Sequence, residues 1–290
     1  MNIIRFLKKC LNDRPAAVIS AKIVLRSLYA KLWWSIYPNK PLVHNLLEGG
    51  RVLLWKNDSF TTCLYPSVET YEIEVKACMK QVLKEGSVFI DIGANIGYYS
   101  VLAKQIVGSV GKVISVEPNP DTFNKLKLNC NKNSIDSPIQ CAIDTECGEI
   151  ELFVPVSGDI WASVNKNVFQ KGQQTYCFKV VSLSIDKLVE DKDLKQVDLI
   201  KIDIEGGELN ALISAKKVLQ QYRPVVIIEY SKKTWLPFGA SPELLKVFLE
   251  DIKYQVFQFD KNLYSFKSVD EKDWESQYVN LILSPNENLH

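Results

Sequence analysis

An acidic residue and two glycines lie where a cofactor-binding turn would place them. An apolar run beginning at Val88 ends at Asp91, and Gly93 and Gly97 follow; a second apolar run ends at Glu117, twenty residues past Gly97. This order is typical of a strand–turn–helix–strand unit that holds a nucleoside-bearing cofactor. Taken singly, Asp91 fits a turn or helix-capping acid and the glycines fit an ordinary turn. All four residues in register favour the cofactor site.

The charge of Asp91 indicates which cofactor this would be. The dinucleotide fingerprint is G-x-G-x-x-G, but Asn95 and Tyr98 occupy its second and third glycine places. A carboxylate in this turn would oppose a pyrophosphate and favour a cation, and S-adenosylmethionine carries an ammonium and a sulfonium. Glu117 would accept hydrogen bonds from both ribose hydroxyls. We therefore expect S-adenosylmethionine, with a nicotinamide-dependent oxidoreductase as the remaining enzyme alternative.

Three further carboxylates lie at the ends of two later apolar runs. Asp203 ends one run, Glu205 comes two residues later, and Glu229 ends the next. Neighbouring parallel strands would bring them together beside the cofactor, where like charges raise one another's pKa unless a cation intervenes. They are our candidate catalytic residues, since an attacking hydroxyl needs a base, which Asp203 or Glu205 could provide. The alternatives are a donor-orienting role for Asp203, a loop-fixing role for Glu205 and a structural role for Glu229.

Other catalytic groups are scarce. The only histidines are His44 and His290, so acid–base chemistry must come from Asp, Glu, Lys, Tyr or Cys. Mg²⁺ would fit a carboxylate cluster, but such clusters also occur without metal, and we expect none. The seven cysteines form no CxxC pair, which disfavours zinc and favours a reduced intracellular setting. The net charge of +1 gives no indication of a nucleic-acid partner.

Apolar runs alternate with helical patterns, which predicts an α/β fold whose parallel sheet is covered by helices on both faces. The expected strands are 88–92, 112–116, 138–143, 197–203, 224–230, 254–259 and 277–283. The expected helices are 69–84, 96–107, 120–132, 207–221 and 241–251. Between 144 and 182 lies an insertion with two short strands, 149–154 and 175–182. Four aromatic residues either line the acceptor site or cover the core: Trp161, Tyr176, Trp235 and Phe238.

The N-terminal region differs from the rest. Residues 1–41 hold eight Lys or Arg and one acid, and 1–37 are predicted to form one or two amphipathic helices, interrupted near Pro15. A hairpin of 51–55 with 61–65 should follow. We divide the chain into a basic helical extension, 1–45, and a second domain, 46–290.

Two interpretations of the extension stay open. It packs on the domain or a partner, or it rests on a membrane through a basic, Trp-bearing surface. No run of 18 apolar residues could span a bilayer, and the N-terminus does not have the pattern of a signal peptide. We expect a cytoplasmic protein, and the second interpretation adds peripheral contact at the inner face of the membrane.

Three motifs in order resemble the FkbM-type methyltransferases. They are DIGANIGYYS at 91–100, EPNP at 117–120 and KIDIEGGE at 201–208, and the resemblance runs from about residue 70 to 230. It implies the class I methyltransferase fold, a Rossmann-like seven-stranded sheet with a reversed last strand, and S-adenosylmethionine as donor. The first 45 residues lie outside the resemblance.

Carried over by position, the resemblance implies the donor contacts. The glycine-spaced turn would border the methionine part, Glu117 would hold the ribose, and residues 142–144 with Asn119 would border the adenine. The full set of expected donor-binding residues is Asp91, Gly93, Ala94, Asn95, Gly97, Glu117, Pro118, Asn119, Ala142, Ile143, Asp144 and Asp203.

The resemblance also implies a reaction class. Members of the family are frequently O-methyltransferases, so we expect methylation of a hydroxyl on a saccharide, glycolipid or other natural product. The expected partner is a small-molecule or glycan acceptor, and the sequence gives no oligomeric state. The alternatives are an N- or C-methyltransferase of the same fold and an inactive donor-binding or scaffold protein.

Overall fold

The structure is a computed structural model of the 290-residue chain. It describes residues 14–56, 58, 61, 64–68, 70–136, 138–156, 162–260, 263–274 and 278–285. The chain divides into two compact units, Met1–Asn45 with Leu53–Ile73, and Leu46–Val52 with Glu74–His290.

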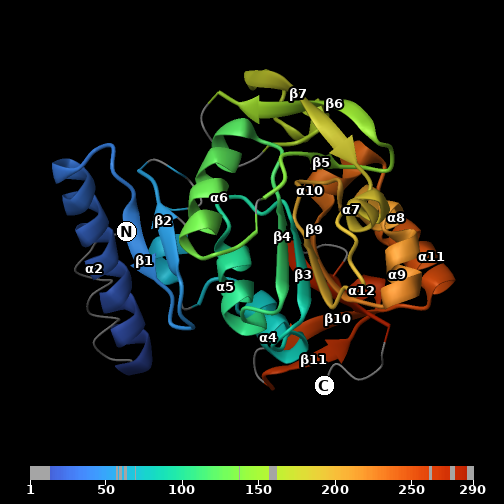
Figure 1. The fold of residues 1–290 in the computed structure, drawn as a ribbon, viewed down its shortest axis with the longest axis horizontal. Helices are drawn as coiled ribbons and strands as arrows, with labels where there is room; N and C mark the ends of the chain where they lie inside the picture. Colours follow the sequence, from blue (N-terminus) through green and yellow to red (C-terminus); the bar gives the residue numbers. More distant parts are fainter. Residues whose placement is uncertain are drawn as a thin grey trace. The chain divides into compact units, whose positions relative to one another are not determined.

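The first unit is built around one long helix, α2 (Arg14–Ile36), which packs on the 3₁₀-helix η1 (Tyr65–Ser67) (Figure 1). Pro15 lies in the first turn of α2, a position that favours proline. The part of the predicted helical region before Arg14 lies outside the described residues. Its apolar side chains do not form the single stripe of an amphipathic helix, because they occupy two opposite faces.

The predicted hairpin of 51–55 with 61–65 is wrong. Strand β2 (Arg51–Leu54) instead pairs with β1 (Leu42–Asn45), through a turn in which Gly49 and Gly50 both have positive φ. After β2, the Asp58 side chain accepts a hydrogen bond from the Thr61 backbone amide at 3.1 Å. This is helix-capping chemistry, and a proline in η1 suits a helical first turn.

A seven-stranded mixed sheet forms the centre of the second unit (Figure 1). Its order is β11 (Ser265–Ser268), β10 (Gln255–Asp260), β12 (Tyr278–Ser284), β9 (Val225–Ser231), β8 (Leu199–Ile202), β3 (Val88–Ile92), β4 (Lys112–Val116). The strands β4, β3, β8 and β9 pair in parallel, and β12 runs antiparallel to β9 and β10. The sheet therefore has the reversed last strand expected of the class I methyltransferase fold.

One predicted strand of this sheet is wrong in its extent. Of 138–143, only Ala142 and Ile143 form a strand, β5, and β5 belongs to a separate sheet of order β5-β7-β6. Ile139 makes one isolated parallel bridge to Val116. Pro138 offers no backbone donor to a ladder, and β11 supplies the seventh strand instead. The other two strands of the second sheet are β6 (Gly148–Pro155) and β7 (Thr175–Leu183), close to the predicted insertion strands.

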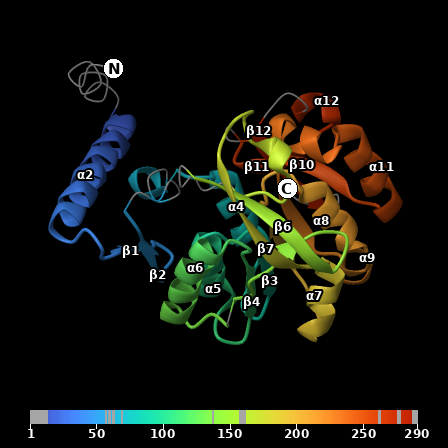
Figure 2. The same cartoon turned by 90° about the horizontal axis from the view of Figure 1, so that it is seen from above.

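Helices cover both faces of the large sheet (Figure 2). On one face, α5 packs on β3 and β4; on the other, α8 packs on β9 and contacts α7. The predicted helix 207–221 is two helices that meet at Ala215. The helices and 3₁₀-helices of this unit are α4 (Ile73–Val82), α5 (Tyr98–Val107), α6 (Pro120–Lys132), η2 (Lys166–Val168), α7 (Ile185–Asp191), α8 (Glu208–Ser214), α9 (Lys216–Tyr222), α10 (Lys232–Trp235), η3 (Leu236–Phe238), α11 (Pro242–Ile252) and α12 (Glu271–Trp274).

The alternation of side chains along the strands places apolar residues on one face of the sheet and polar residues on the other. Ile90, Ile200, Ile202 and Ile228 point into the main apolar core with α7, α8, α9 and α11. Because neighbours along a strand point to opposite faces, the residues between them project toward the face that α5 covers. Among the described residues, no helix is long and apolar enough to cross a membrane.

Candidate active site

A row of polar side chains crosses the face of the sheet that α5 covers, near the carboxyl ends of the parallel strands. Asp91 of β3 is in register with Lys201 of β8, and Glu229 of β9 with Asn280 of β12. Asp203 follows Lys201 by two residues and shares its face. We call Asp91, Lys201, Asp203, Glu229 and Asn280 the polar row. Asp91, Lys201 and Glu229 are all buried, so their charges must be balanced by partners or ligands.

The turn after β3 is shaped for close backbone approach. Gly93 has φ +76°, and a Cβ there would lie 1.8 Å from the Asp203 carbonyl oxygen. A Cβ at Gly97 (φ +89°) would lie 2.7 Å from the Leu126 side chain. Asn95 has φ +51°, a left-handed conformation that asparagine tolerates well. Asparagine therefore replaces the second glycine of the dinucleotide fingerprint without forcing the backbone out of this turn.

Glu117 connects this turn to the start of α6. Its Oε2 accepts a hydrogen bond from the Asn95 backbone amide and its Oε1 from the Asn119 amide, both at 3.0 Å. Burial raises the pKa of Glu117 to about 7, although the two amides oppose the shift. Each carboxylate oxygen has a second lone pair, so Glu117 keeps acceptor capacity for a ligand. Asn119 in turn caps α6 by accepting from Asp121.

Only one of the two carboxylate oxygens of Asp91 has a hydrogen-bond partner among the described residues. Its Oδ2 accepts a 2.6 Å hydrogen bond from the Ser100 hydroxyl, which is itself bonded to Ser115. Its Oδ1 is buried and has no hydrogen-bond partner among the described residues. Burial raises the pKa of Asp91, and the charge of Lys201 opposes that shift. This turn therefore presents buried anionic capacity, which suits a cation and not a pyrophosphate.

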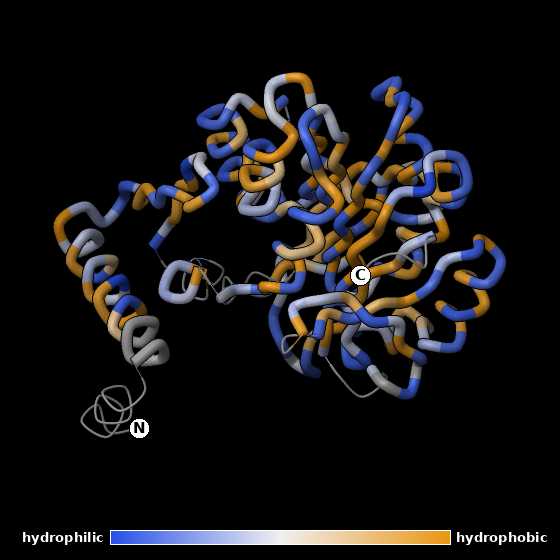
Figure 3. The backbone as a smooth tube through the Cα atoms, turned by 90° about the horizontal axis from the view of Figure 1, so that it is seen from below, coloured by the Kyte–Doolittle hydropathy of each residue, from blue (hydrophilic) through white to orange (hydrophobic). Residues whose placement is uncertain are grey.

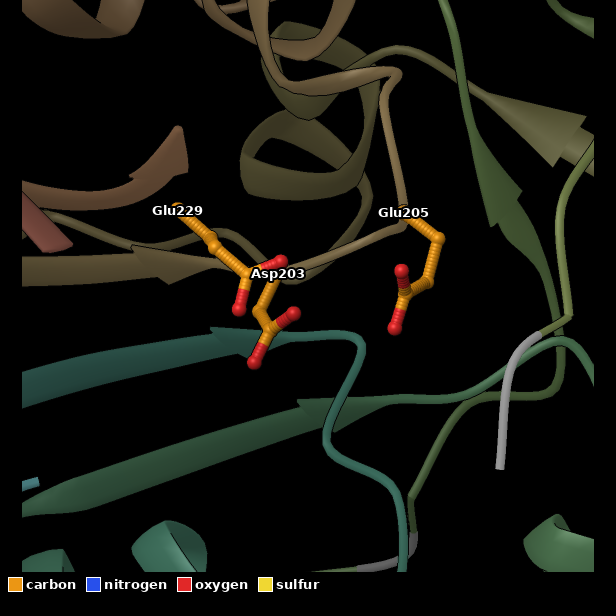
Figure 4. A group of neighbouring side chains, drawn as sticks. All are labelled: Asp203, Glu205 and Glu229. Carbon is orange, nitrogen blue, oxygen red and sulfur yellow. The ribbon is translucent and has the colours of Figure 1, made fainter. Parts of the chain in front are cut away.

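The three candidate catalytic carboxylates meet. Asp203, Glu205 and Glu229 each offer an oxygen within 4.8 Å of the others, with Asp203 and Glu205 on the loop after β8 and Glu229 on β9 (Figure 4). Burial, followed by the charges of Asp203 and Glu208, raises the pKa of Glu205 to about 8. Burial and the charges of Asp203 and Glu205 also raise the pKa of Glu229. We call these three residues the acid cluster.

Two residues that the sequence analysis missed balance the acid cluster. The Lys201 ammonium lies 2.7 Å from Asp203 Oδ2, with its side chain only 3% exposed, and 5.0 Å from the centre of the Tyr99 ring. The Tyr278 hydroxyl donates to Glu229 Oε1. Strand alternation could have placed Lys201 beside Asp203. Tyr278 had no signal in the sequence, because its place depends on the register of β12 against β9.

The loop that carries Glu205 is tightly constrained. Glu205 has φ +59°, and a Cβ at Gly206 would lie 2.3 Å from the Thr234 carbonyl oxygen. The Glu208 carboxylate accepts from the amides of Ile204 and Gly206, so Glu208 fixes this loop. The Ser163 hydroxyl donates to the Glu205 carbonyl at 3.1 Å. A non-glycine residue in the left-handed region at such a place is typical of a functional site.

Several predicted residues lie apart from these contacts. Ala142 and Ile143 pair with β7, and Asp144 bonds its own turn and Asn210; within the described part of the chain, none of these bonds reaches the Gly93 turn. Ala94, by contrast, lies within the Gly93 turn, and its backbone amide donates a hydrogen bond to the Val116 carbonyl. Trp235 is 1% exposed and bonds the Glu229 carbonyl, so it belongs to the core. Trp161 lies outside the described residues.

The chain is similar to known methyltransferases. The model of the Methyltransferase FkbM domain matches residues 91–259. A hexuronic acid methyltransferase of Haloferax volcanii is 29% identical over 157 residues, which are 54% of this chain and 61% of that protein. A methyltransferase of Sordaria araneosa is 24% identical, with 58% of this chain and 73% of that protein covered. The chain therefore spans about three fifths of the Haloferax relative.

Among solved structures, a methyltransferase FkbM from Methylobacillus flagellatus has 15% sequence identity and a TM-score of 0.42. That match covers 78% of this chain and 55% of the other.

Proposed function

The chain belongs to the FkbM methyltransferase family, and from that premise we propose that it methylates a hydroxyl oxygen of a saccharide, glycolipid or other natural product. The methyl donor is S-adenosylmethionine. The observation that carries the proposal is the acid cluster, which lies next to the Gly93 turn and offers bases where an acceptor hydroxyl would need one. The Haloferax relative, named for hexuronic acid, supports a saccharide acceptor.

The donor fits the residues around the Gly93 turn. Asp91 and Glu117 are buried acids with remaining acceptor capacity, and the turn leaves no room for a Cβ at Gly93. We assign the methionine part to the turn and Asp203, the ribose to Glu117, and the adenine to Asn119 and residues 142–144. Ala94 and Pro118 are assigned as backbone contacts of the same ligand.

The acid cluster supplies the base. When bound, the donor presents an electrophilic methyl group on a positively charged sulfur. Glu205 or Asp203 would take the proton of the acceptor hydroxyl and so make its oxygen nucleophilic enough to accept the methyl group that the donor would supply. Glu205 is the stronger candidate, because Lys201 already occupies one oxygen of Asp203 and a pKa of about 8 suits a base near neutral pH. Glu229 is the weaker candidate, because one of its oxygens already accepts a hydrogen bond from the Tyr278 hydroxyl.

The test uses the donor with a panel of uronic-acid and neutral oligosaccharides. Mass spectrometry and NMR of the product would locate the new methyl group, and calorimetry would measure donor binding. A methyl group on a hydroxyl oxygen supports the proposal, whereas one on nitrogen or carbon would replace it with the corresponding alternative. An absence of donor binding would favour the inactive scaffold.

A metal is a separate question for the same cluster. Three carboxylate oxygens within 4.8 Å of one another could hold a divalent cation such as Mg²⁺. We propose that none is required, because Lys201 and Tyr278 already engage two of the carboxylates. Treatment with EDTA should leave methyl transfer unchanged, and a loss that Mg²⁺ restores would show that the cluster is a metal centre.

We also propose that residues 1–45 form an extension to a methyltransferase domain at 46–290, with peripheral contact at the cytoplasmic face of a membrane through residues 1–37. The basic composition of residues 1–41 supports the contact. The described cysteines form no disulfide, which supports the cytoplasmic side of the membrane. Deletion of residues 1–37 should loosen association with anionic liposomes. Equal binding by both forms would favour a helix packed on protein.

A further inference from the structure

Helix α2 has an apolar face that no described residue of its own unit covers. Leu25, Leu28, Tyr29, Leu32 and Ile36 are each at least 51% exposed. At 3.6 residues per turn they fall within an arc of about 100°. Figure 3 shows apolar segments recurring along this helix, at the left of the view. We call these five residues the outer face of α2.

The opposite side of the helix is already used. Ile23, Ala30 and Trp34 are half-buried or buried, and the helix packs on η1. They lie about half a turn around the helix from the outer face. A helix that is apolar on both sides normally has both sides covered, so the outer face requires an occupant.

The charges near the outer face indicate the chemistry of that occupant. From Arg14 to Leu47 the chain carries five basic residues, Arg14, Lys22, Arg26, Lys31 and Lys40, and no acid. Lys22 and Lys31 lie on either flank of the outer face by helical spacing. Two copies packed face to face would oppose like charges, whereas an anionic lipid surface would attract them.

Aromatic side chains support the same occupant. Tyr29, Trp33 and Tyr37 form a continuous row of tilted rings, with ring centres 6.4 Å and 4.8 Å apart. Tyr and Trp favour the boundary between lipid headgroups and acyl chains, because their rings are apolar and their tips are polar. The outer face of α2 therefore combines exposed apolar side chains with basic flanks and boundary aromatics, a combination found in helices that lie on a bilayer.

We propose that the outer face of α2 lies in the headgroup region of a bilayer rich in anionic phospholipid, with Lys22 and Lys31 against the phosphates. This assigns a face and a lipid class to the proposed peripheral contact and rests on it, but it does not depend on the acceptor. An enzyme held at such a surface would meet acceptors carried on lipid.

The experiment is co-sedimentation of the full chain with two kinds of vesicle, phosphatidylcholine alone and phosphatidylcholine with one quarter phosphatidylglycerol. Wild type should sediment with the anionic vesicles at least 10-fold more than with the neutral ones. Leu28→Asp/Leu32→Asp should lose that binding at least 10-fold. The control Val110→Asp/Val247→Asp adds the same charge at exposed apolar positions elsewhere and should sediment as wild type does.

Further measurements separate the possible outcomes. Lys22→Glu/Lys31→Glu should lose anionic binding while it keeps the helical circular dichroism of wild type. Calorimetry of donor binding on every variant shows that the fold is intact and separates this proposal from the methyltransferase function. Wild type that binds donor but neither vesicle, or L28D/L32D that sediments as wild type does, overturns the proposal. So does a wild-type dimer that L28D/L32D dissociates in ultracentrifugation without vesicle binding, since a second copy would then be the occupant.

Discussion

The acids that we assign to the donor, Asp91 and Glu117, and those of the acid cluster are stabilised in different ways. Both oxygens of Glu117 are bonded by backbone amides, those of Asn95 and Asn119. Asp203, Glu205 and Glu229 instead face one another within 4.8 Å, and side chains, Lys201 and Tyr278, balance them. The backbone fixes Glu117 when the chain folds, whereas the charge of the acid cluster depends on which protons or cations are present.

This difference matters for the chemistry. A donor site should have one geometry, because the cofactor is always the same molecule. A base must change its protonation state in each cycle, and a group balanced by side chains with a pKa of about 8 can do so near neutral pH. Lys201 links the two regions, since it pairs with Asp203 and its charge also acts on Asp91.

Replacing Lys201 should have the largest effect. Lys201→Met leaves Asp203 and Asp91 without their buried cation, and loss of one partner of a buried pair costs roughly 3–5 kcal/mol. Urea denaturation should show this as a fall in the free energy of unfolding. Lys179→Met, which removes an exposed pair with Glu149, is the control and should unfold as wild type does. Equal stability of the two variants would mean that Lys201 does not hold the two regions together.

Glu117→Ala tests the donor side by itself. Loss of the ribose acceptor should weaken S-adenosylmethionine binding by roughly 2–4 kcal/mol, or about 30- to 1000-fold, as measured by calorimetry. Asp121→Ala, an exposed acid in the first turn of α6, is the control. Unchanged donor affinity in Glu117→Ala would disprove the ribose assignment.

The geometry of the Gly93 turn could be predicted because its information is local. Asp91, Gly93 and Gly97 are close in sequence, and the backbone follows from their types. Glu117 and Asp203 could be placed as well, since each ends an apolar run and parallel strands end at one edge of a sheet. The same reasoning brought Glu205 and Glu229 together.

The remaining parts depend on contacts that a single sequence does not encode locally. Tyr278 reaches Glu229 only through the register of β12 against β9. The role of Glu208 in fixing the Glu205 loop depends on a turn with two positive-φ residues. The predicted hairpin of 51–55 with 61–65 is wrong because residues 56–59 have the composition of a strand turn, whereas Gly49 and Gly50 lie in the turn that joins β1 to β2. Pro138 argues against a strand over all of 138–143, because proline has no backbone N–H to donate to a neighbouring strand.

The pH dependence of stability should separate the two regions. The pKa values of Glu117 (about 7) and Glu205 (about 8) both lie above the ordinary 4.5, so between 4.5 and these values the folded protein holds more protons than the unfolded chain. The free energy of unfolding must then fall as pH rises through this window, by at most about 1.4 kcal/mol per pH unit for each proton.

Thermal unfolding from pH 5 to 9 checks this. Glu117→Gln should reduce the part of the slope that ends near pH 7, to which Glu208, with a pKa that burial also raises to about 7, contributes as well. Glu205→Gln should reduce the part that continues to pH 8. Saturating S-adenosylmethionine should flatten both, because its positive charges favour the ionised acids. Glu151→Gln, at an exposed position, should keep the wild-type slope. A Glu205→Gln profile identical to wild type would show that Glu205 is not protonated in the folded protein at neutral pH.

Replacing Ser163 should have the smallest effect on stability, because its hydroxyl contacts only the backbone carbonyl of Glu205 and no side chain of the acid cluster. Ser163→Ala removes the hydrogen bond to the Glu205 carbonyl and should cost about 1 kcal/mol of stability. Because no donor-side residue contacts Ser163 among the described hydrogen bonds, donor affinity should stay at the wild-type value while methyl transfer slows several-fold. Ser35→Ala, which removes an exposed hydroxyl, should change neither. If donor affinity falls as much as the transfer rate does, the Glu205 loop belongs to the donor side, and the two regions are one preformed unit.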